Sequence, residues 1–345
     1  MRTNITPKKR TVSYLFLLPF FLLFARCESN RFDVDIKNKD INFEVKRYDK
    51  DFFAFQNENH ETVNQKLTAK YGSFHTLYLT NIMALGHPED PATKKQIAGF
   101  VNNSDISLLT DSVHNQFTNF SPFAQQIETG FKYYQHWFPE KHIPEVITFM
   151  GAFNYNVAVT DSVLGIGLEY YLGSDFELYK TAGLPFYKIK KMKPEFLAYD
   201  AIRGWLLSEF AQAENQDFLL AAIIEYGKAL YLMDAVFPHG EDHLKVGFKK
   251  EELNWCAQNE HHIWQSMMNS DMLFSKDQNA IKKYTGEAPF TPGMPEDSPG
   301  RVGNWVGWQI VRAYAEKHPE LSPEEIVSLT DYKNILSKSK YKPAK

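Results

Sequence analysis

The segment from Phe218 to Leu230 constrains the fold more than any other part of the chain. It predicts a helix that is apolar on every face except around Glu225 and Lys228. A helix that is hydrophobic all round has to be buried among other elements. We therefore expect a large helical core, with a few polar groups enclosed within it.

A second predicted helix begins at Phe196 and carries Tyr199, Asp200 and Arg203. The spacing from Tyr199 to Arg203 matches the helix of a zinc metallopeptidase, in which two histidines four residues apart bind the metal and a glutamate beside them takes a proton from the bound water. Glu225 stands where a gluzincin places its further ligand. Both histidines are missing, however: tyrosine, with a pKa of about 10, is a poor zinc ligand at neutral pH, and a guanidinium has no lone pair to donate.

Two interpretations of this frame remain open. In the first, Tyr199, Asp200, Arg203 and Glu225 form a structural ion-pair cluster, in which Arg203 replaces the metal. This interpretation predicts no catalytic residue, no metal and no cofactor. In the second, the two segments are ordinary amphipathic helices and the five-residue match is incidental.

The N-terminus has the pattern of a lipoprotein signal peptide over residues 1–26. A basic region ending at Arg10 precedes an apolar stretch from Thr11 to Phe24, which is too short for a comfortable membrane span. Phe24-Ala25-Arg26-Cys27 resembles a lipobox, with Cys27 as the lipidated residue. Because Arg26 stands where a small residue is expected, an uncleaved N-terminal anchor is the alternative. In either case the chain lies outside the cytoplasmic membrane, in the cell envelope, facing the periplasm or the surface.

Charge excludes two classes of partner. The formal net charge of the chain is −4, and removing the five basic residues of segment 1–26 leaves 33 basic against 42 acidic groups, a net charge of −9. Such a surplus of acid argues against binding to nucleic acid or to anionic lipid. The membrane tie is therefore the acyl anchor. Cys256 is then left without a disulfide partner, and we expect it to be buried.

The predicted fold is α+β, mostly helical, with one domain over residues 41–345 after a polar tether over residues 27–40. Residues 41–46 alternate apolar and polar and predict an edge strand. Segments 146–150, 155–159 and 163–168 predict three short strands in a small antiparallel meander. Together with the helix of Arg203, these elements predict a gluzincin-like frame that lacks the metal ligands.

Patterns in the C-terminal third predict further helices. Residues 249–274 predict one long amphipathic helix, and residues 304–314 another, in which Gly303 and Gly307 allow close approach of a neighbouring helix. Ser322 and Pro323 form a helix start with a capping box. His239 and His243 could share a metal ion if they lay on one helix, but Pro238 and Gly240 favour a loop there.

Several segments together resemble the gliding-motility lipoprotein family GldB of Bacteroidota, and the resemblance extends over essentially the whole mature chain. The most specific is Trp308-Gln-Ile-Val-Arg312 within its Gly/Trp-rich surroundings. The others are the lipobox, Arg47-Tyr-Asp-Lys-Asp-Phe-Phe, Asp200-Ala-Ile-Arg203-Gly-Trp205, Ile224-Glu225-Tyr-Gly227-Lys-Ala-Leu-Tyr231, Trp255-Cys256-Ala-Gln-Asn-Glu260, Ala288-Pro-Phe, Pro299-Gly-Arg301-Val-Gly303 and Ser339-Lys-Tyr-Lys-Pro343.

The resemblance implies a non-enzymatic, palmitate-bearing lipoprotein of the cell envelope that supports gliding motility and the associated type IX secretion machinery. Its implied partners are the membrane, through the lipid anchor, and other gliding and secretion proteins, with no nucleic acid and no small-molecule substrate. The family is itself distantly similar to predicted zinc peptidases with a His-Glu-x-x-His motif. Two alternatives are a peptidase with an unusual metal site that uses His239 and His243, and a lipoprotein that binds glycan or peptide through exposed aromatic residues.

Overall fold

The computed structural model describes residues 1, 30–211, 217–268 and 272–344, in two units, Met1–Arg31 and Phe32–Lys345. Every helix and strand given below lies in the second unit. The predicted signal peptide and Cys27 lie outside the described residues. Phe32 is buried against Trp137 and Tyr231, so residues 32–40, which we predicted to be part of a tether, belong to the packed unit.

Four short strands form one mixed sheet in the order β1-β2-β4-β3. β1 pairs with β2 and β2 with β4 in parallel, with Val146 opposite Leu164, whereas β3 pairs with β4 in antiparallel fashion. The bounds are β1 Val45–Arg47, β2 Glu145–Phe149, β3 Val157–Val159 and β4 Val163–Gly167.

The predicted antiparallel meander is therefore wrong, because β4 lies between β2 and β3. Burial explains the difference. β4 is buried at every residue and β2 at all but its first, as is usual for parallel strands with both faces covered. A meander with one solvated face would alternate instead. The predicted edge strand at residues 41–46 is found slightly later, as β1 at the outer edge of the sheet.

Side-chain caps start three of the N-terminal helices. Asn59, Asp90 and Asn103 each accept hydrogen bonds from backbone N–H groups of the first helical turn, which would otherwise lack partners. The helices of this half are α1 Tyr48–Asp51, α2 His60–Tyr71, α3 Ser73–Leu77, α4 Pro91–Val101, α5 Ser104–Gln116 and α6 Ser121–Trp137.

The second half of the chain contributes the remaining helices. The predicted capping box at Ser322 is confirmed. The predicted long helix over residues 249–274 is broken at Asn259, whose side-chain amide donates to the carbonyl of Trp255 and closes the first helix. The bounds are α7 Leu178–Thr181, α8 Phe186–Ile189, α9 Leu197–Phe210, α10 Leu219–Val236, α11 Asp242–Val246, α12 Lys250–Gln258, α13 Glu260–Met268, α14 Gln278–Thr285, α15 Val302–Lys317, α16 Pro323–Val327 and α17 Tyr332–Ser339.

Helices α10 and α15 cross with their backbones in contact. A Cβ atom on Gly307 would lie 1.7 Å from the carbonyl oxygen of Ile223, and one on Gly227 would lie 2.3 Å from the carbonyl carbon of Gly307. Only glycine allows two helices to approach this closely. The close approach predicted for Gly307 is therefore confirmed, and α10 is buried along nearly its whole length, as its apolar sequence requires.

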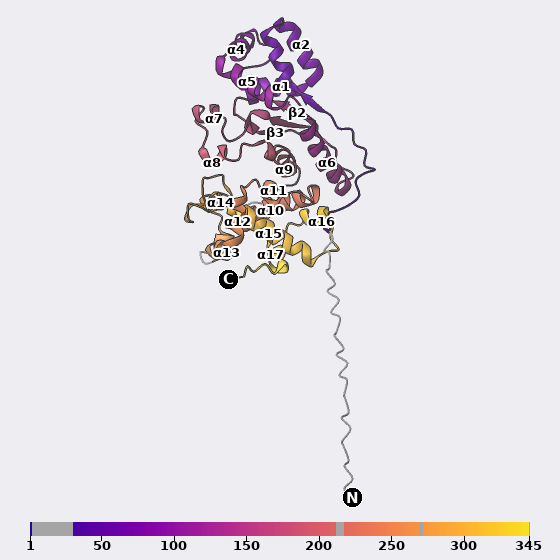
Figure 1. Ribbon diagram of the computed structural model, residues 1–345, viewed down its shortest axis with the longest axis vertical. Helices are drawn as coiled ribbons and strands as arrows, with labels where there is room; N and C mark the ends of the chain where they lie inside the picture. Colours follow the sequence, from indigo (N-terminus) through magenta and orange to yellow (C-terminus); the bar gives the residue numbers. More distant parts are fainter. Residues whose placement is uncertain (2–29, 212–216, 269–271, 345) are drawn as a thin grey trace. The chain divides into compact units, whose positions relative to one another are not determined.

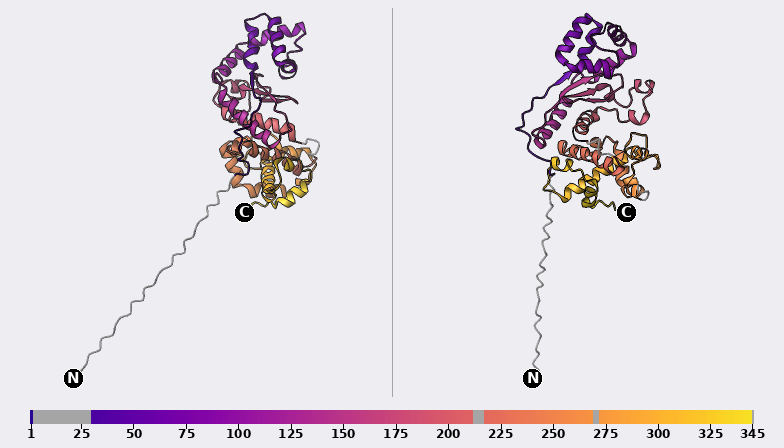
Figure 2. Two further views of the ribbon diagram at one scale, coloured as in Figure 1. Left: turned by 90° about the vertical axis from the view of Figure 1, so that its right-hand side faces the viewer. Right: turned by 180° about the vertical axis from the view of Figure 1, so that it is seen from behind.

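The sheet separates α2, α4 and α5 from the core helices, whereas α6 packs against α9 and α10. In Figure 1, α2, α4 and α5 lie beyond one side of the strands and α9 and α10 beyond the other, and the two views of Figure 2 keep this order. Helix α9 packs against β3 and β4, and α10 packs against α9. This arrangement places Asp200 and Arg203 of α9 near the loops that flank the sheet.

Candidate functional site

Asp200 and Arg203 form an ion pair on one face of α9, as residues three apart on a helix can. Both side chains are mostly buried, with exposed fractions of 15% and 11%. The hydroxyl of Tyr171 donates to the second carboxylate oxygen of Asp200 at 3.2 Å. Burial alone would lower the pKa of Arg203, but the adjacent Asp200 raises it overall. The guanidinium is therefore held in its charged form.

The last carbonyls of α11 hold the other side of the Arg203 guanidinium. Its Nη1 donates to the carbonyl oxygens of Leu244 and Lys245 at 3.2 and 3.0 Å. Carbonyls at a helix end lack partners within the helix and favour a cation. Gly247, the residue that follows α11, has a φ of +74°, and a Cβ there would lie 2.9 Å from Nη2 of Arg203. Glycine is thus required both for the turn and for the close contact.

Glu225 belongs to a different ion pair. It is fully buried on α10 and accepts from the ammonium of Lys228 at 2.5 Å. Lys228 also donates to the carbonyl of Leu329 and lies over the ring of Tyr332. The predicted cluster of Arg203 with Glu225 is therefore wrong. The cause is the three-residue spacing within each helix, which gives each charge a nearer partner on its own helix.

Tyr199 lies apart from both pairs. Its ring packs against Phe237 with centroids 4.5 Å apart, and burial raises the pKa of its hydroxyl. Of the four residues predicted to replace a metal, only Asp200 and Arg203 are brought together. The phenol instead belongs to the apolar core, where a tyrosine is more common than a charged group.

A cavity of about 300 Å³ opens beside the Asp200–Arg203 pair, and we call it the charged pocket. Six charged side chains line it: four cationic and two acidic, for a formal surplus of two positive charges. They are Lys188, Lys191, Asp200, Arg203, Glu287 and Arg301; the remaining wall is formed by Asn154, Asn156, Tyr170, Tyr171, Met192, Phe196 and Gly247.

Arg301 reaches the charged pocket from the start of α15. Its backbone is left-handed, with a φ of 60°, and its side chain is 10% exposed. Its guanidinium contacts the carboxylate of Glu287 at 3.1 Å and donates to the carbonyl of Gly247 at 3.3 Å. Burial would raise the pKa of Glu287, but Arg301 and Lys191 lower it overall. The acid therefore stays ionised between its two cations.

Lys191 is the third mostly buried cation of the pocket. Its side chain is 17% exposed, and its ammonium lies 3.9 Å from Glu287, beyond hydrogen-bond distance. Among the residues that the structure describes, no acceptor bonds to this ammonium. Burial, followed by repulsion from Arg301, lowers its pKa. The pocket thus contains a mostly buried cation that shares Glu287 with Arg301 and makes no hydrogen bond to the described part of the chain.

Sequence reasoning missed four of the six charges, Lys188, Lys191, Glu287 and Arg301. Two signals could have found them. The run from Lys188 to Lys193 places four lysines directly before α9. Arg301 directly follows Gly300 and precedes Gly303 by two residues, at the turn where the buried helix α15 begins.

A second charged centre lies between α10, α11 and α15, and we call it the balanced network. Asp234 accepts from Lys245 at 2.9 Å, from Trp308 at 2.9 Å and from two nitrogens of Arg312 at 2.6 and 2.7 Å. Asp242 completes it, accepting from Arg312 at 2.8 Å and from Lys245 at 3.2 Å. Two acids face two bases, and both carboxylate oxygens of Asp234 are satisfied.

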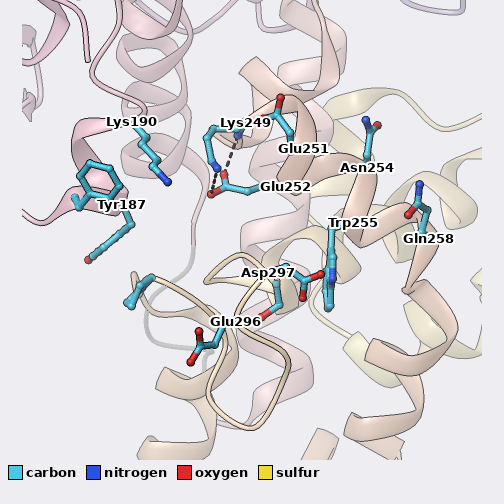
Figure 3. A pocket seen from close by; sticks show the side chains of 13 residues that line it. Tyr187, Lys190, Lys249, Glu251, Glu252, Asn254, Trp255, Gln258, Glu296 and Asp297 are labelled. Carbon is cyan, nitrogen blue, oxygen red and sulfur yellow. Dashed lines mark hydrogen bonds and ion pairs between the residues drawn. The ribbon is translucent and has the colours of Figure 1, made fainter. Parts of the chain in front are cut away.

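A separate open groove of about 800 Å³, the aromatic groove, is shown from close by in Figure 3. Trp255 of α12, Tyr187 of α8 and the 64%-exposed Phe186 contribute its rings. Four acids and two lysines also line it: Glu251, Glu252, Glu296, Asp297, Lys190 and Lys249. Lys190 lines this groove, whereas its neighbour Lys191 lines the charged pocket.

The two histidines considered as metal ligands have other partners. His239 is exposed and contacts Asp33 at 3.1 Å, whereas His243 is buried on α11 and contacts Glu241 at 3.4 Å. Within residues 30–211, 217–268 and 272–344, no group of three or more potential ligands is close enough to hold a metal ion. Cys256 is buried, as predicted, and burial raises the pKa of its thiol.

Comparison with known proteins supplies the family. The pattern of the family described as gliding motility protein GldB matches residues 29–343. The chain belongs to the GldB family. Membership identifies it as a gliding-motility-related lipoprotein and supports a place in the cell envelope. No helix among the described residues is both long and apolar enough to span a membrane.

Neither the curated proteins nor the solved structures yielded a match. The likeness to metallopeptidases therefore remains a hypothesis, which rests on the Tyr199-to-Arg203 spacing in this member of the GldB family.

Proposed function

We propose that this GldB family member is a non-enzymatic, lipid-anchored component of the cell envelope that supports gliding motility and the associated type IX secretion machinery. The observation that carries the proposal is the family match over residues 29–343. The basic and apolar segments before Cys27 support the lipid anchor, because they form a signal that ends in a cysteine.

The surroundings of Arg203 support a scaffold role on a degenerate metallopeptidase-like frame. A ligand position must offer a lone pair, and a guanidinium has none. Here the guanidinium is bound by Asp200 and by two carbonyls of α11. An arginine held in this way cannot act as a metal ligand, and it instead fixes the contact between α9 and α11.

Complementation in cells tests the anchor and the gliding role together. Deleting the gene should abolish colony spreading, and the wild-type chain should restore it. Cys27→Ser should fail to restore spreading and should not incorporate a fatty-acid analogue. Cys256→Ala is the matched control, since it removes the other cysteine and should keep both signals. Spreading restored fully by Cys27→Ser would contradict the anchor.

The secretion link and the absence of catalysis need their own measurements. The deletion strain should lose type IX cargo from the medium, and the wild-type chain should restore it. Purified full chain should contain less than stoichiometric zinc and should leave a generic peptide pool intact. Stoichiometric zinc together with peptide hydrolysis that is lost in Asp200→Asn would favour the peptidase alternative.

The aromatic groove favours a second candidate function, glycan binding. Trp255, Tyr187 and Phe186 offer ring faces on which sugars can stack, and Asn254 and Gln258 lie beside them with the amide groups that hydroxyls require. The surplus of acid in the groove selects for a neutral glycan. The other indole rings do not gather there: Trp205, Trp305 and Trp308 are buried.

Tryptophan fluorescence tests this candidate with cellohexaose and chitohexaose as probes. A saturable change is expected for the wild-type chain, with at least tenfold weaker binding in Phe186→Ala. Phe274→Ala is the matched control, because Phe274 is 53% exposed and does not line the groove. Equal binding by all three proteins, or none by the wild type, would exclude the groove as a glycan site.

A further inference from the structure

The charged pocket has the composition of an anion site. It encloses about 300 Å³, which is at the lower end of the volumes of small-molecule sites. A self-contained ion network would pair each base with an acid, as buried charges need partners. Here the mostly buried Lys191, Arg203 and Arg301, together with the exposed Lys188, face only Asp200 and Glu287. The surplus of two positive charges has no counterpart in the described wall.

The hydrogen bonds of the two arginines also leave donors free for an anion. A guanidinium carries five N–H donors. Arg203 uses three of them, on Asp200, Leu244 and Lys245. Arg301 also makes three contacts, with Tyr226, Gly247 and Glu287. Each guanidinium therefore keeps about two N–H groups beyond these bonds.

Lys191 adds the strongest observation. Its side chain is 17% exposed and lines the cavity, its ammonium has no hydrogen-bond acceptor among the described residues, and its ion-pair partner Glu287 lies 3.9 Å away. Desolvating an ammonium without an acceptor is unfavourable. A bound anion would supply the missing acceptors and would also separate Lys191 from the positive charge of Arg301.

We propose that the charged pocket binds the phosphate group of a small phosphate monoester through Lys191, Arg203 and Arg301. A monoester carries close to two negative charges at neutral pH, which matches the surplus of two positive charges. Its three free oxygens suit the forked geometry of two guanidinium groups and the point charge of an ammonium. The cavity leaves room for a small organic group on the fourth oxygen. Phosphate binding by the purified chain is independent of the proposed envelope role.

Neighbouring lysines provide a matched pair of variants. Lys191→Met removes one proposed phosphate donor, whereas Lys190→Met removes an equal charge whose side chain lines the aromatic groove instead. The full chain is titrated by calorimetry with inorganic phosphate at constant ionic strength, with chloride as the reference salt. Circular dichroism spectra establish that both variants are folded.

The expected result is saturable phosphate binding by the wild type, weakened at least tenfold in Lys191→Met and by less than twofold in Lys190→Met. A second variant, Arg301→Lys, keeps the charge but loses the fork, and should also weaken binding at least tenfold. Phosphate heats equal to those of chloride would overturn the proposal. So would equal losses in the two lysine variants, since these would indicate general screening rather than a site.

Two further ligands identify the source of the phosphate. Glycerol 3-phosphate represents a free metabolite, and dihexanoyl phosphatidic acid, a soluble short-chain lipid, represents a membrane headgroup. Tighter binding of glycerol 3-phosphate supports the proposal with a free ligand, and tighter binding of the lipid supports it with a headgroup. Failure of both to compete with inorganic phosphate would contradict a monoester ligand.

Discussion

The balanced network and the charged pocket both include residues of helix α11, but their buried charges are neutralised to different extents. In the network, side chains of α11 join Asp234 and Arg312, and two acids neutralise two bases. At the pocket, backbone carbonyls of the same helix hold Arg203, and four bases face two acids. The comparison teaches that charge balance, and not burial alone, distinguishes a structural network from a site with capacity for a ligand.

The largest effect should come from breaking the balanced network. Asp234→Ala would leave Arg312 and Lys245 with only the more exposed Asp242 to share, at a cost of about 3–5 kcal/mol in the free energy of unfolding. Urea denaturation measures this change. Asp297→Ala, which removes an exposed carboxylate, is the control and should stay within about 0.5 kcal/mol of the wild type. A similar change in both variants would mean that the network contributes no special stability.

Glu169 extends the comparison to a buried acid without a cation. Burial raises its pKa to about 7, although the backbone N–H groups of Gly151 and Phe153 donate to one carboxylate oxygen. Because the folded-state pKa lies above the unfolded value, the stabilisation is present at low pH and is lost as pH rises from about 4.5 to about 7. The loss is on the order of 3 kcal/mol.

The pH dependence of Glu169→Gln isolates this contribution. The difference in unfolding free energy between the wild type and the variant should change over that pH interval and level off above it. Urea denaturation at a series of pH values provides the measurement. A constant difference from acid to neutral pH would show that folding does not raise the pKa of Glu169.

Arg203→Met sharpens the comparison at the edge of the charged pocket. Within the described part of the chain, the variant leaves the carboxylate of Asp200 with the hydroxyl of Tyr171 as its hydrogen-bond donor. It also removes the donor of two carbonyls of α11. We expect a loss of about 1–3 kcal/mol, since Asp200 retains one donor and some access to water. The thermal unfolding midpoint should fall accordingly, and an unchanged midpoint would rule out a structural role for the pair.

Lys191→Met should have the smallest effect on stability. No hydrogen bond of this ammonium is lost among the described residues, and the penalty for burying a charge disappears. The free energy of unfolding in phosphate-free buffer should change by less than about 1 kcal/mol, in either direction. A loss of unfolding free energy as large as that of Asp234→Ala would show that Lys191 stabilises the fold, as the balanced network does.

The sequence predicted the core better than the sheet or the site. The apolar helix at Phe218 and the close approach at Gly307 are confirmed, because an apolar surface and a missing side chain act wherever the helix packs. The sequence did not predict the order of the strands, because β2 and β4 pair in parallel through contacts between residues that are not neighbours in sequence. The unbroken apolar and glycine run of β4 was the available signal, because strands buried on both faces do not alternate.

The ion pairs show why sites are harder to predict. The spacing on α9 and α10 correctly put charges inside the core but could not tell which charge meets which, and Arg203 and Glu225 each pair within their own helix. Lys191 and Arg301 enter the pocket from segments about a hundred residues apart. Convergence of this kind depends on the tertiary fold, which periodicity within one segment does not specify.

The glycine crossing of α10 and α15 also limits how the family can vary in length. One residue inserted between Gly227 and Asp234 would rotate the carboxylate by about 100° around the helix, away from its two bases. The same holds between Gly307 and Arg312. Exposed turns such as residues 292–297 can lengthen without this consequence. Insertions and deletions among homologues should therefore be excluded from these two helical stretches, while substitutions there continue.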